Sequence, residues 1–267
     1  MTLETNPIRP DIPATTHPDA LAGYAATLDR EGTIGRAAYH EARDTLGIVY
    51  RTLGAVADAE KAFLAHVNAT TPALRRQKPD GRTEYLGQLR MQDGKPRVFS
   101  SHDEEFAEAA ATALDRAAQV VDRRLASLNR SRDGLETRVA EALKDTAHPP
   151  AVHAEIRAHL KGLSDSKRVS WLMSAAKRGD KATMHAILSA PAFLSGLTEE
   201  QVALARNEAA RAVAAQDFEQ LQALQNVIAA VEQAGGKIVL RTGELARYRN
   251  GTGARVGRAV KGLKEVR

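Results

Sequence analysis

Two long stretches of the chain repeat apolar residues at alternating spacings of three and four. The first lies between Thr33 and Asn68, and its seam positions are Tyr39, Ala42, Leu46, Val49, Leu53, Val56, Glu60, Phe63 and Val67, of which only Glu60 is charged. The second lies between Ser101 and Ala147, and its seam positions are Ala110, Leu114, Ala117, Val121, Leu125, Leu128, Leu135, Val139 and Ala142. An apolar seam on a helix is stable only when another helix covers it. The sequence therefore predicts that these two helices pack as an antiparallel pair.

The composition supports long helices in close contact. Alanine accounts for 49 residues, whereas phenylalanine, tyrosine and tryptophan together account for 11. Alanine is the best helix former but fills little volume, so it favours close helix packing over a thick globular core. The predicted fold class is mainly α: long antiparallel helices with one small β-hairpin, a second small helical unit, an extended N-terminal arm and a C-terminal tail.

Proline, glycine and changes of period set the predicted domain boundaries. Four prolines disfavour a helix near the N-terminus, and Pro149-Pro150 must follow the end of the second long helix. Asp93-Gly94 lies between apolar runs and predicts a hairpin, whereas Gly235-Gly236 predicts the end of a helix that begins near Glu199. The predicted division is an extended arm over 1–18, a long-helix domain over 19–148 with a β-hairpin over 84–100, a small helical domain over 149–236, and a basic, glycine-rich tail over 237–267.

The tripeptide Arg178-Gly179-Asp180 matches a cell-adhesion motif, but its surroundings predict a helix junction. Apolar residues repeat at helical spacing on both sides of it. Glycine readily adopts the positive φ that ends a helix, and aspartate is a favoured N-cap of the next one. We therefore interpret the tripeptide as a turn.

Cysteine and long apolar runs are both missing from the sequence. The lack of cysteine excludes disulfides, thiolate metal ligands and cysteine nucleophiles, and it fits a reducing cytoplasm. No run approaches the roughly 18 to 20 apolar residues needed to cross a bilayer, and residues 1–18 lack the apolar core of a signal peptide. The sequence thus predicts a soluble protein without a membrane partner.

Histidines near the double proline are the best candidates for a catalytic or metal site. His153-Ala154-Glu155 matches the first half of a zinc-deaminase signature, but the second half requires cysteines that the chain lacks. We therefore interpret His148, His153 and His159 as structural. Because no catalytic constellation is complete, we predict a protein that is not an enzyme and holds no metal or cofactor. An unrecognised site around His153, Glu155 and His159 is the alternative.

The last 31 residues carry all of the excess positive charge. Residues 237–267 hold nine Lys or Arg against Glu244 and Glu265, a net charge of +7, whereas the whole chain has +5 and residues 1–236 therefore sum to −2. The candidate binding residues are Arg247, Arg249, Arg255, Arg258, Lys261 and Lys264. Their ligand is nucleic-acid phosphate or an acidic surface of a partner protein, unless the tail only aids solubility. Only Tyr248 is available for base stacking, so sequence-specific recognition of a single strand is disfavoured.

Between Leu172 and Ala210, an alanine-glycine-aspartate helix turn precedes a helix that ends in a proline and a Leu-Ser-Gly-Leu turn. The residues of this pattern are Ala176, Gly179, Asp180, Pro191, Leu194, Ser195, Gly196 and Leu197. The pattern resembles a short helical module of small proteins encoded in the structural gene clusters of tailed bacteriophages. The resemblance implies a virion-assembly setting and no particular activity.

These features lead to the expected function. We expect a non-enzymatic structural or assembly protein of a phage particle, in its head, neck or an internal complex, that is assembled in the host cytoplasm and resides in the virion. Its expected partners are phage structural proteins or copies of itself in a homo-oligomer. The alternative is a non-specific nucleic-acid-binding protein outside the virion, with DNA bound through residues 237–267.

Overall fold

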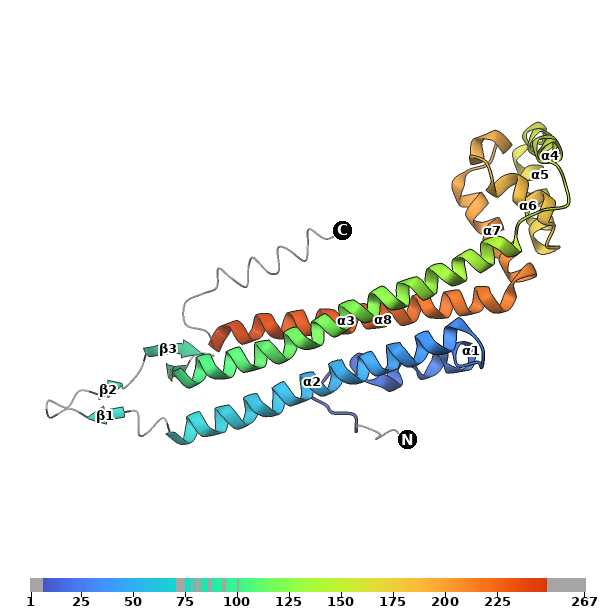
Figure 1. Ribbon diagram of the computed structural model, residues 1–267. Coiled ribbons are helices and arrows are strands. Elements are labelled where there is room, and N and C mark those ends of the chain that lie inside the picture. The colour runs from blue at the N-terminus through green and yellow to red at the C-terminus, as the bar shows by residue number, and fades with distance from the viewer. Residues whose placement is uncertain are drawn as a thin grey trace. The chain divides into compact units, whose positions relative to one another are not determined.

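The computed structural model describes residues 7–70, 75–77, 79, 83–85, 88–92, 95–99 and 101–248, and the chain is mainly helical (Figure 1). The α-helices are α1 (Ala25–Leu28), α2 (Ile34–Thr70), α3 (Ser101–Ala142), α4 (Pro150–Gly162), α5 (Asp165–Lys177), α6 (Lys181–Leu188), α7 (Glu199–Val213) and α8 (Ala215–Leu245). The 3-10 helices are η1 (Ala14–Thr16), η2 (Pro18–Tyr24), η3 (Ala192–Ser195) and η4 (Ala246–Tyr248). The strands are β1 (Arg75–Gln77), β2 (Thr83–Tyr85), β3 (Gln88–Gln92) and β4 (Lys95–Phe99).

The chain divides into two compact units, each built from separated stretches of sequence. Unit 1 draws on described residues within Met1–Gly23, Glu41–Ala126 and Ile228–Arg267, and unit 2 draws on Tyr24–His40 and Ser127–Val227. Helices α2, α3 and α8 therefore contribute residues to both units, whereas α4 to α7 belong to unit 2. This division is not consecutive along the chain, unlike the one expected from the sequence.

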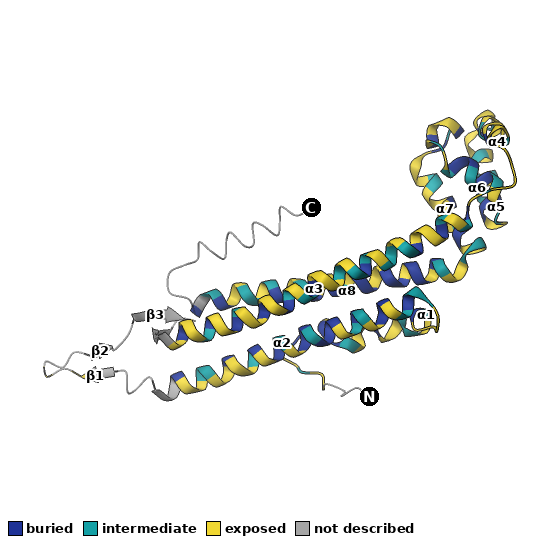
Figure 2. Cartoon of the chain, viewed as in Figure 1, coloured by how far each residue is buried: buried dark blue, intermediate teal, exposed yellow. Residues whose placement is uncertain are grey.

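In unit 1, parts of α2, α3 and α8 form a three-helix bundle. The Arg124 guanidinium pairs with the Glu41 carboxylate at 2.9 Å, and the Phe63 ring stacks on Phe106 with centroids 4.8 Å apart. Because Glu41 and Arg124 lie at opposite ends of these segments from the two rings, α2 and α3 run in opposite directions. Stretches of buried residues recur along the three helices (Figure 2). The buried residues include Leu46, Val49, Leu53, Val56, Leu114, Ala117, Val121, Val231, Ala234 and Ile238.

Helix α8 continues beyond the glycine pair at which the sequence predicts its end. It runs through Gly235-Gly236 to Leu245, and the side chains of Ile238 and Leu245 are buried. A Cβ atom on Gly235 would lie 3.2 Å from Cγ1 of Val121, so the missing side chain lets α8 approach α3 closely. Glycine in a helix costs about 1 kcal/mol relative to alanine, and burial of the later apolar residues offsets this cost. The expected tail over 237–267 is therefore helical in its first part.

The described N-terminal segment folds onto α2, so the expectation of an extended arm over 1–18 is wrong for this part. The segment forms η1 and η2, and its Ile12 side chain is buried. The Tyr50 hydroxyl on α2 accepts a hydrogen bond from the Arg9 backbone N–H at 2.5 Å and donates one to the Pro7 carbonyl at 2.9 Å. Prolines exclude an α-helix here, but they do not prevent packing against a neighbouring helix.

The predicted fold class, with one small β-hairpin over residues 84–100, is wrong as a description of the strands, because the described residues form two antiparallel pairs and only β3 with β4 lies wholly within that range. Strands β1 and β2 form one antiparallel sheet, and β3 and β4 form another. Residues Thr83–Tyr85, at the start of the expected hairpin, pair with Arg75–Gln77, which lies before it. Short strands pair through backbone hydrogen bonds, which the periodicity of side chains does not reveal.

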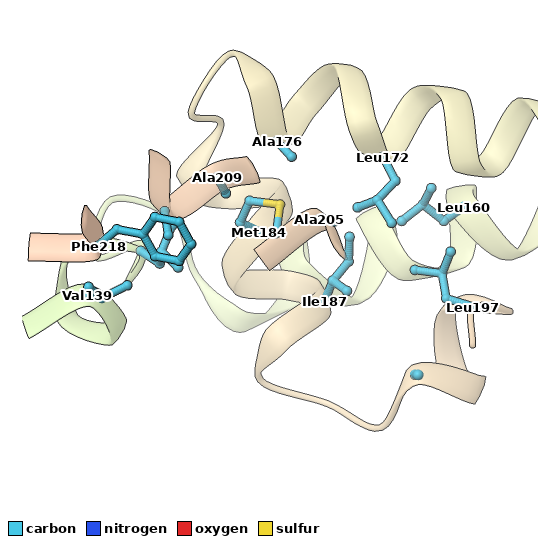
Figure 3. Close-up of a cluster of buried hydrophobic side chains, with 13 residues drawn as sticks. Val139, Leu160, Leu172, Ala176, Met184, Ile187, Leu197, Ala205, Ala209 and Phe218 are labelled. Atoms are coloured by element: carbon cyan, nitrogen blue, oxygen red, sulfur yellow. The ribbon is translucent and has the colours of Figure 1, made fainter. Parts of the chain in front are cut away.

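Unit 2 is a helical module with its own apolar core (Figure 3). Helix α5 packs on α7, and α4 packs on α6 and η3. The core residues are Val139, Leu143, Leu160, Leu172, Ala176, Met184, Ile187, Ala192, Leu197, Ala205, Ala209, Ala210 and Phe218. Its alanines lie on α5 and α7 as well as η3, and their small side chains allow these elements to pack closely.

The Arg178-Gly179-Asp180 tripeptide is the helix junction that the sequence predicts. Gly179 has a φ of 68°, and Oδ1 of Asp180 accepts a hydrogen bond of 3.1 Å from the Thr183 N–H at the start of α6. A Cβ atom on Gly179 would lie 2.9 Å from Cγ2 of Val213. Glycine therefore meets both the conformational and the steric demand of this turn, and the prediction is confirmed.

Arg168 joins two parts of unit 2 through main-chain carbonyls. Its Nε donates to the Leu160 carbonyl at 2.9 Å, and its Nη2 donates to the Leu163 carbonyl at 2.7 Å. Its Nη1 donates to the Gly196 carbonyl at 2.5 Å. One guanidinium thus satisfies carbonyls at the end of α4 and in the turn after η3. The sequence analysis did not identify this role, because carbonyl acceptors distant in sequence leave no residue pattern.

Candidate functional site

A cavity of about 550 Å³, called the large cavity below, is lined by residues of α3, α6, α7 and α8 in unit 2. Its apolar lining includes Val139, Ile187 and Phe218, which also belong to the core of the unit. Its charged and amide lining residues are Glu136, Glu199, Arg206, Asn207, Gln222 and Gln225. The lining thus mixes apolar side chains with charged and amide groups, and it can offer a ligand both apolar and polar contacts.

A second cavity of about 280 Å³, called the basic cavity below, adjoins the first. Leu188 and Arg206 line both cavities. The residues that line the basic cavity are Ala140, Leu143, Lys144, His185, Leu188, Ser189 and Arg206. Its lining, as far as the chain is described, thus combines two cations, an imidazole and a hydroxyl with aliphatic side chains, and it includes no carboxylate.

The ring of His185, which lines the basic cavity, packs against a cluster formed by His148, His153 and Asp145. The His185 ring packs on His153 with centroids 4.8 Å apart, and Nε2 of His153 lies 2.9 Å from Oδ2 of Asp145. Nδ1 of His148 lies 2.9 Å from the same oxygen. The hydrogen bonds from His153, from the Ala147 N–H and from His148 hold the pKa of Asp145 well below its usual range. His185 therefore packs against an ordered, largely structural cluster.

The histidines nominated from the sequence are engaged in structural contacts. His153 is bonded to Asp145, and the His159 ring lies edge-on to Trp171 with centroids 5.8 Å apart. Glu155 is exposed on α4. Among the described residues, no group of three His, Asp or Glu side chains is placed to hold a metal ion. The structure therefore does not assemble His153, Glu155 and His159 into a metal site.

The described chain ends in a cluster that we call the Tyr248 anchor, formed by Glu60, Phe63, Phe106, Arg241 and Tyr248 in unit 1. The Tyr248 hydroxyl donates to Oε1 of Glu60 at 2.6 Å, and Arg241 pairs with Oε2 of the same carboxylate. The Tyr248 ring lies edge-on to Phe63 and Phe106, at 5.9 and 5.3 Å between centroids. Glu60, the charged interruption of the first apolar seam, is thus the one sequence signal that could have indicated this cluster.

Two basic residues of the expected tail belong to the helix α8 and are half-buried. Lys237 and Arg241 lie in α8, and Arg241 donates to Glu244 at 2.6 Å as well as pairing with Glu60. Burial disfavours the charged form of Arg241, but its hydrogen bonds to Glu244 and Glu60 outweigh this effect and raise its pKa. Arg241 is therefore half-buried and paired with two carboxylates of unit 1.

The candidate binding residues lie on both sides of Tyr248 in the chain. Arg247 lies in η4. The others lie outside the described residues: Arg249, Arg255, Arg258, Lys261 and Lys264. The stretch 247–267, called the basic stretch below, holds seven Lys or Arg against Glu265, a net charge of +6. Tyr248 is fully buried, so the tyrosine that the sequence analysis considered for base stacking is not available for it.

Sequence reasoning identified neither cavity. Their lining comes from four helices, and the contributing positions on α3 and α8 are more than 70 residues apart. Comparison of the chain with protein-family models, with curated proteins and with solved structures gave no match. Within the described ranges, no helix combines the length and the apolar character that a membrane span requires. The two cavities, the Tyr248 anchor and the basic stretch are therefore the features that bear on function.

Proposed function

We propose that this chain is a non-enzymatic structural or assembly protein of a phage particle, a component of its head, neck or an internal complex, that acts by binding other proteins. The observation that carries this proposal is the pair of adjoining cavities in unit 2, where apolar and charged side chains of several helices line one region. Such a lining offers a partner both apolar contact and a few directional polar contacts. The nearby histidines are used in structural contacts, which favours binding over catalysis.

The resemblance to phage modules supports the assembly setting. The segment Leu172 to Ala210 contributes the end of α5, then α6, η3 and most of α7. Three residues of the pattern have structural roles. Gly179 and Gly196 adopt positive φ, and Asp180 caps α6. Helices α6 and α7 of this same segment provide much of the lining of both cavities. A module of this kind would therefore carry the binding surface itself.

The protein content of purified particles tests the proposal. We expect mass spectrometry of gradient-purified phage particles to detect the chain in a fixed ratio to the major structural proteins, because a component of a symmetric assembly has a defined copy number. If the chain acts only during assembly, it is absent from particles but its deletion lowers particle yield. Absence from particles together with unchanged yield and morphology after deletion would contradict the proposal.

Non-specific nucleic-acid binding by the basic stretch is a second candidate function. The Tyr248 anchor favours it, because it fixes Tyr248 in unit 1, and the residues that follow, 249–267, hold six Lys or Arg against Glu265, a net charge of +5. Tyr248 is the one aromatic residue of the basic stretch, and its burial removes it from base stacking. Binding would therefore occur through phosphates alone and would not depend on base sequence.

The anchor also determines where a truncation is informative. Deletion from residue 237 would remove Ile238, Leu245 and Tyr248 from the interior of unit 1, so the truncated form must end at Tyr248. If the basic stretch binds DNA, the affinity of the full chain falls by roughly 10³ to 10⁵ between 50 and 200 mM salt for six or more phosphate contacts. The truncated form should then lose binding. Equal affinity of the two forms would exclude the basic stretch as the DNA contact.

A further inference from the structure

We propose that the basic cavity binds a glutamate or aspartate side chain of a partner protein segment, with a neighbouring apolar side chain of that segment against its aliphatic wall. Arg206 is the main contact to the carboxylate. This inference rests on the proposed function, in which the chain binds other proteins, and it names the chemistry of the bound segment.

Arg206 differs in its contacts from Arg211 and Arg157, two other arginines of unit 2. Arg211, on the same helix, pairs with Glu208 at 2.8 Å, and Arg157 donates to the Ala186 carbonyl at 2.8 Å. Arg206 is exposed on α7 and makes no hydrogen bond or ion pair with any residue that the structure describes. A guanidinium offers two parallel N–H donors that match the two oxygens of a carboxylate. Arg206 is therefore available for a bidentate contact from outside.

The other polar groups of the basic cavity favour an anion. Lys144 supplies a second positive charge, although its ammonium already contacts Glu141 at 2.5 Å on the surface. His185 and Ser189 add an imidazole and a hydroxyl. The cavity lining contains no carboxylate among the described residues, whereas the large cavity is lined by Glu136 and Glu199. An incoming acid thus meets two cations and no carboxylate in the basic cavity, whereas in the large cavity Arg206 is accompanied by Glu136 and Glu199.

The shape and the apolar lining favour a peptide segment. Leu143 and Leu188 provide aliphatic surface, and the volume of about 280 Å³ is below the roughly 300 to 1,000 Å³ typical of sites for drug-sized ligands. The basic cavity therefore holds one or two side chains rather than a whole ligand. The adjoining large cavity, which shares Leu188 and Arg206, extends the binding surface for further residues of the same segment.

The charge arrangement also fixes the direction in which a segment lies. Lys144 lines the basic cavity, Glu136 and Glu199 line the large cavity, and Arg206 lines both. Electrostatic complementarity disfavours like charges in contact. The segment therefore places its acidic residue in the basic cavity and carries neutral or basic residues where it meets the large cavity.

The test uses the full-length chain and a matched pair of peptides, N-acetyl-Leu-Glu-Leu-amide and N-acetyl-Leu-Gln-Leu-amide. Binding is followed by the amide resonances of residues that line the basic cavity. We expect the glutamate peptide to bind at least tenfold more tightly and to shift the Leu188 and Ser189 resonances. Free N-acetyl-leucine serves as a third probe, because it carries a carboxylate and an isobutyl group without a peptide chain.

Variants separate the role of Arg206 from a general charge effect. Arg206→Gln should remove the preference for the glutamate peptide, Arg206→Lys should restore part of it, and Arg130→Gln should leave it unchanged. Arg130 is an exposed arginine of unit 2 outside both cavities, so this control removes the same charge. Unchanged amide spectra outside the cavity establish that each variant is folded.

Three results would overturn the inference: equal binding of the two peptides, no effect of Arg206→Gln, or binding of N-acetyl-leucine without binding of the glutamate peptide. The last result would identify a site for a small organic acid instead of a protein segment. These outcomes do not depend on whether the chain is found in purified particles. Failure of the inference and failure of the proposed function are therefore distinguishable.

Discussion

The Tyr248 hydroxyl donates a hydrogen bond of 2.6 Å to Glu60, a residue 188 positions earlier in the chain. The other carboxylate oxygen of Glu60 pairs with Arg241 on α8. A buried carboxylate is costly unless its oxygens find partners, and here both partners come from the C-terminal end of the described chain. This carboxylate therefore joins α2 to the end of α8 in unit 1.

Removal of the Tyr248 hydroxyl should destabilise unit 1. We expect Tyr248→Phe to lower the free energy of unfolding by about 1.5 to 3 kcal/mol, because the lost bond has a charged acceptor. Urea denaturation measures this change. The control is Tyr24→Phe, whose hydroxyl makes no hydrogen bond with a described residue, and it should stay within about 0.5 kcal/mol of the wild type. Similar losses in the two variants would contradict the role of the anchor.

Substitution of the two adjacent glycines of α8 by larger residues should change the free energy of unfolding in opposite directions. A Cβ atom on Gly236 meets nothing within 4 Å, so Gly236→Ala should raise the free energy of unfolding by about 0.5 to 1 kcal/mol. A larger side chain at Gly235 meets Val121, so Gly235→Leu should lower it by about 1 to 3 kcal/mol. Thermal unfolding followed by circular dichroism compares the two variants. A gain in stability for Gly235→Leu would show that α8 does not approach α3 as closely as described.

Arg168 should be intolerant of a conservative exchange. Arg168→Lys keeps the charge but loses the fork that reaches the Leu160, Leu163 and Gly196 carbonyls, so it should cost about 2 to 3 kcal/mol. The matched control is Arg178→Lys, an exposed position whose guanidinium bonds only to Ser174 among described residues, and it should change stability by less than about 0.5 kcal/mol. Chemical denaturation measures the free energy of unfolding of both variants and tests this prediction.

The Asp145 cluster should make the stability of unit 2 dependent on pH in the acid range. The folded-state pKa of Asp145 lies below its unfolded value of about 3.9, so its stabilising contribution is present above that pH and is lost as the pH falls toward the lowered pKa. We expect the Tm of Asp145→Asn to lie below that of the wild type near neutral pH. The difference should shrink as the pH falls below about 4.

An exposed acid provides the comparison for this pH profile. Asp133 pairs with Arg132 at 2.7 Å, but its side chain is 60% exposed, so Asp133→Asn should have little effect at any pH. Calorimetric scans of both variants across the acid range give the profiles. If the Tm difference between the wild type and Asp145→Asn is the same at every pH, ionisation of Asp145 does not contribute to the stability of unit 2.

Local signals in the sequence determined the helices and several of their ends. Aspartate and glutamate in the first turn of α3, the glycine and aspartate between α5 and α6, and the Thr198–Gln201 capping box of α7 all act within a few residues. Each involves groups that are neighbours in the chain, so the relevant free energies are fixed by the sequence nearby. The apolar seams likewise marked most of the side chains that are buried in α2 and α3.

Only the tertiary structure decided where α8 ends, how the N-terminal segment folds, how the strands pair and which residues line the cavities. Gly235-Gly236 predicts a helix end by local propensity, but the burial of Ile238, Leu245 and Tyr248 carries the helix further. Local propensities differ by about 1 kcal/mol per residue, whereas full burial of one large apolar side chain contributes about 1.5 to 3 kcal/mol. That burial depends on partners far away in sequence, such as Glu60 for Tyr248, and no local pattern specifies them.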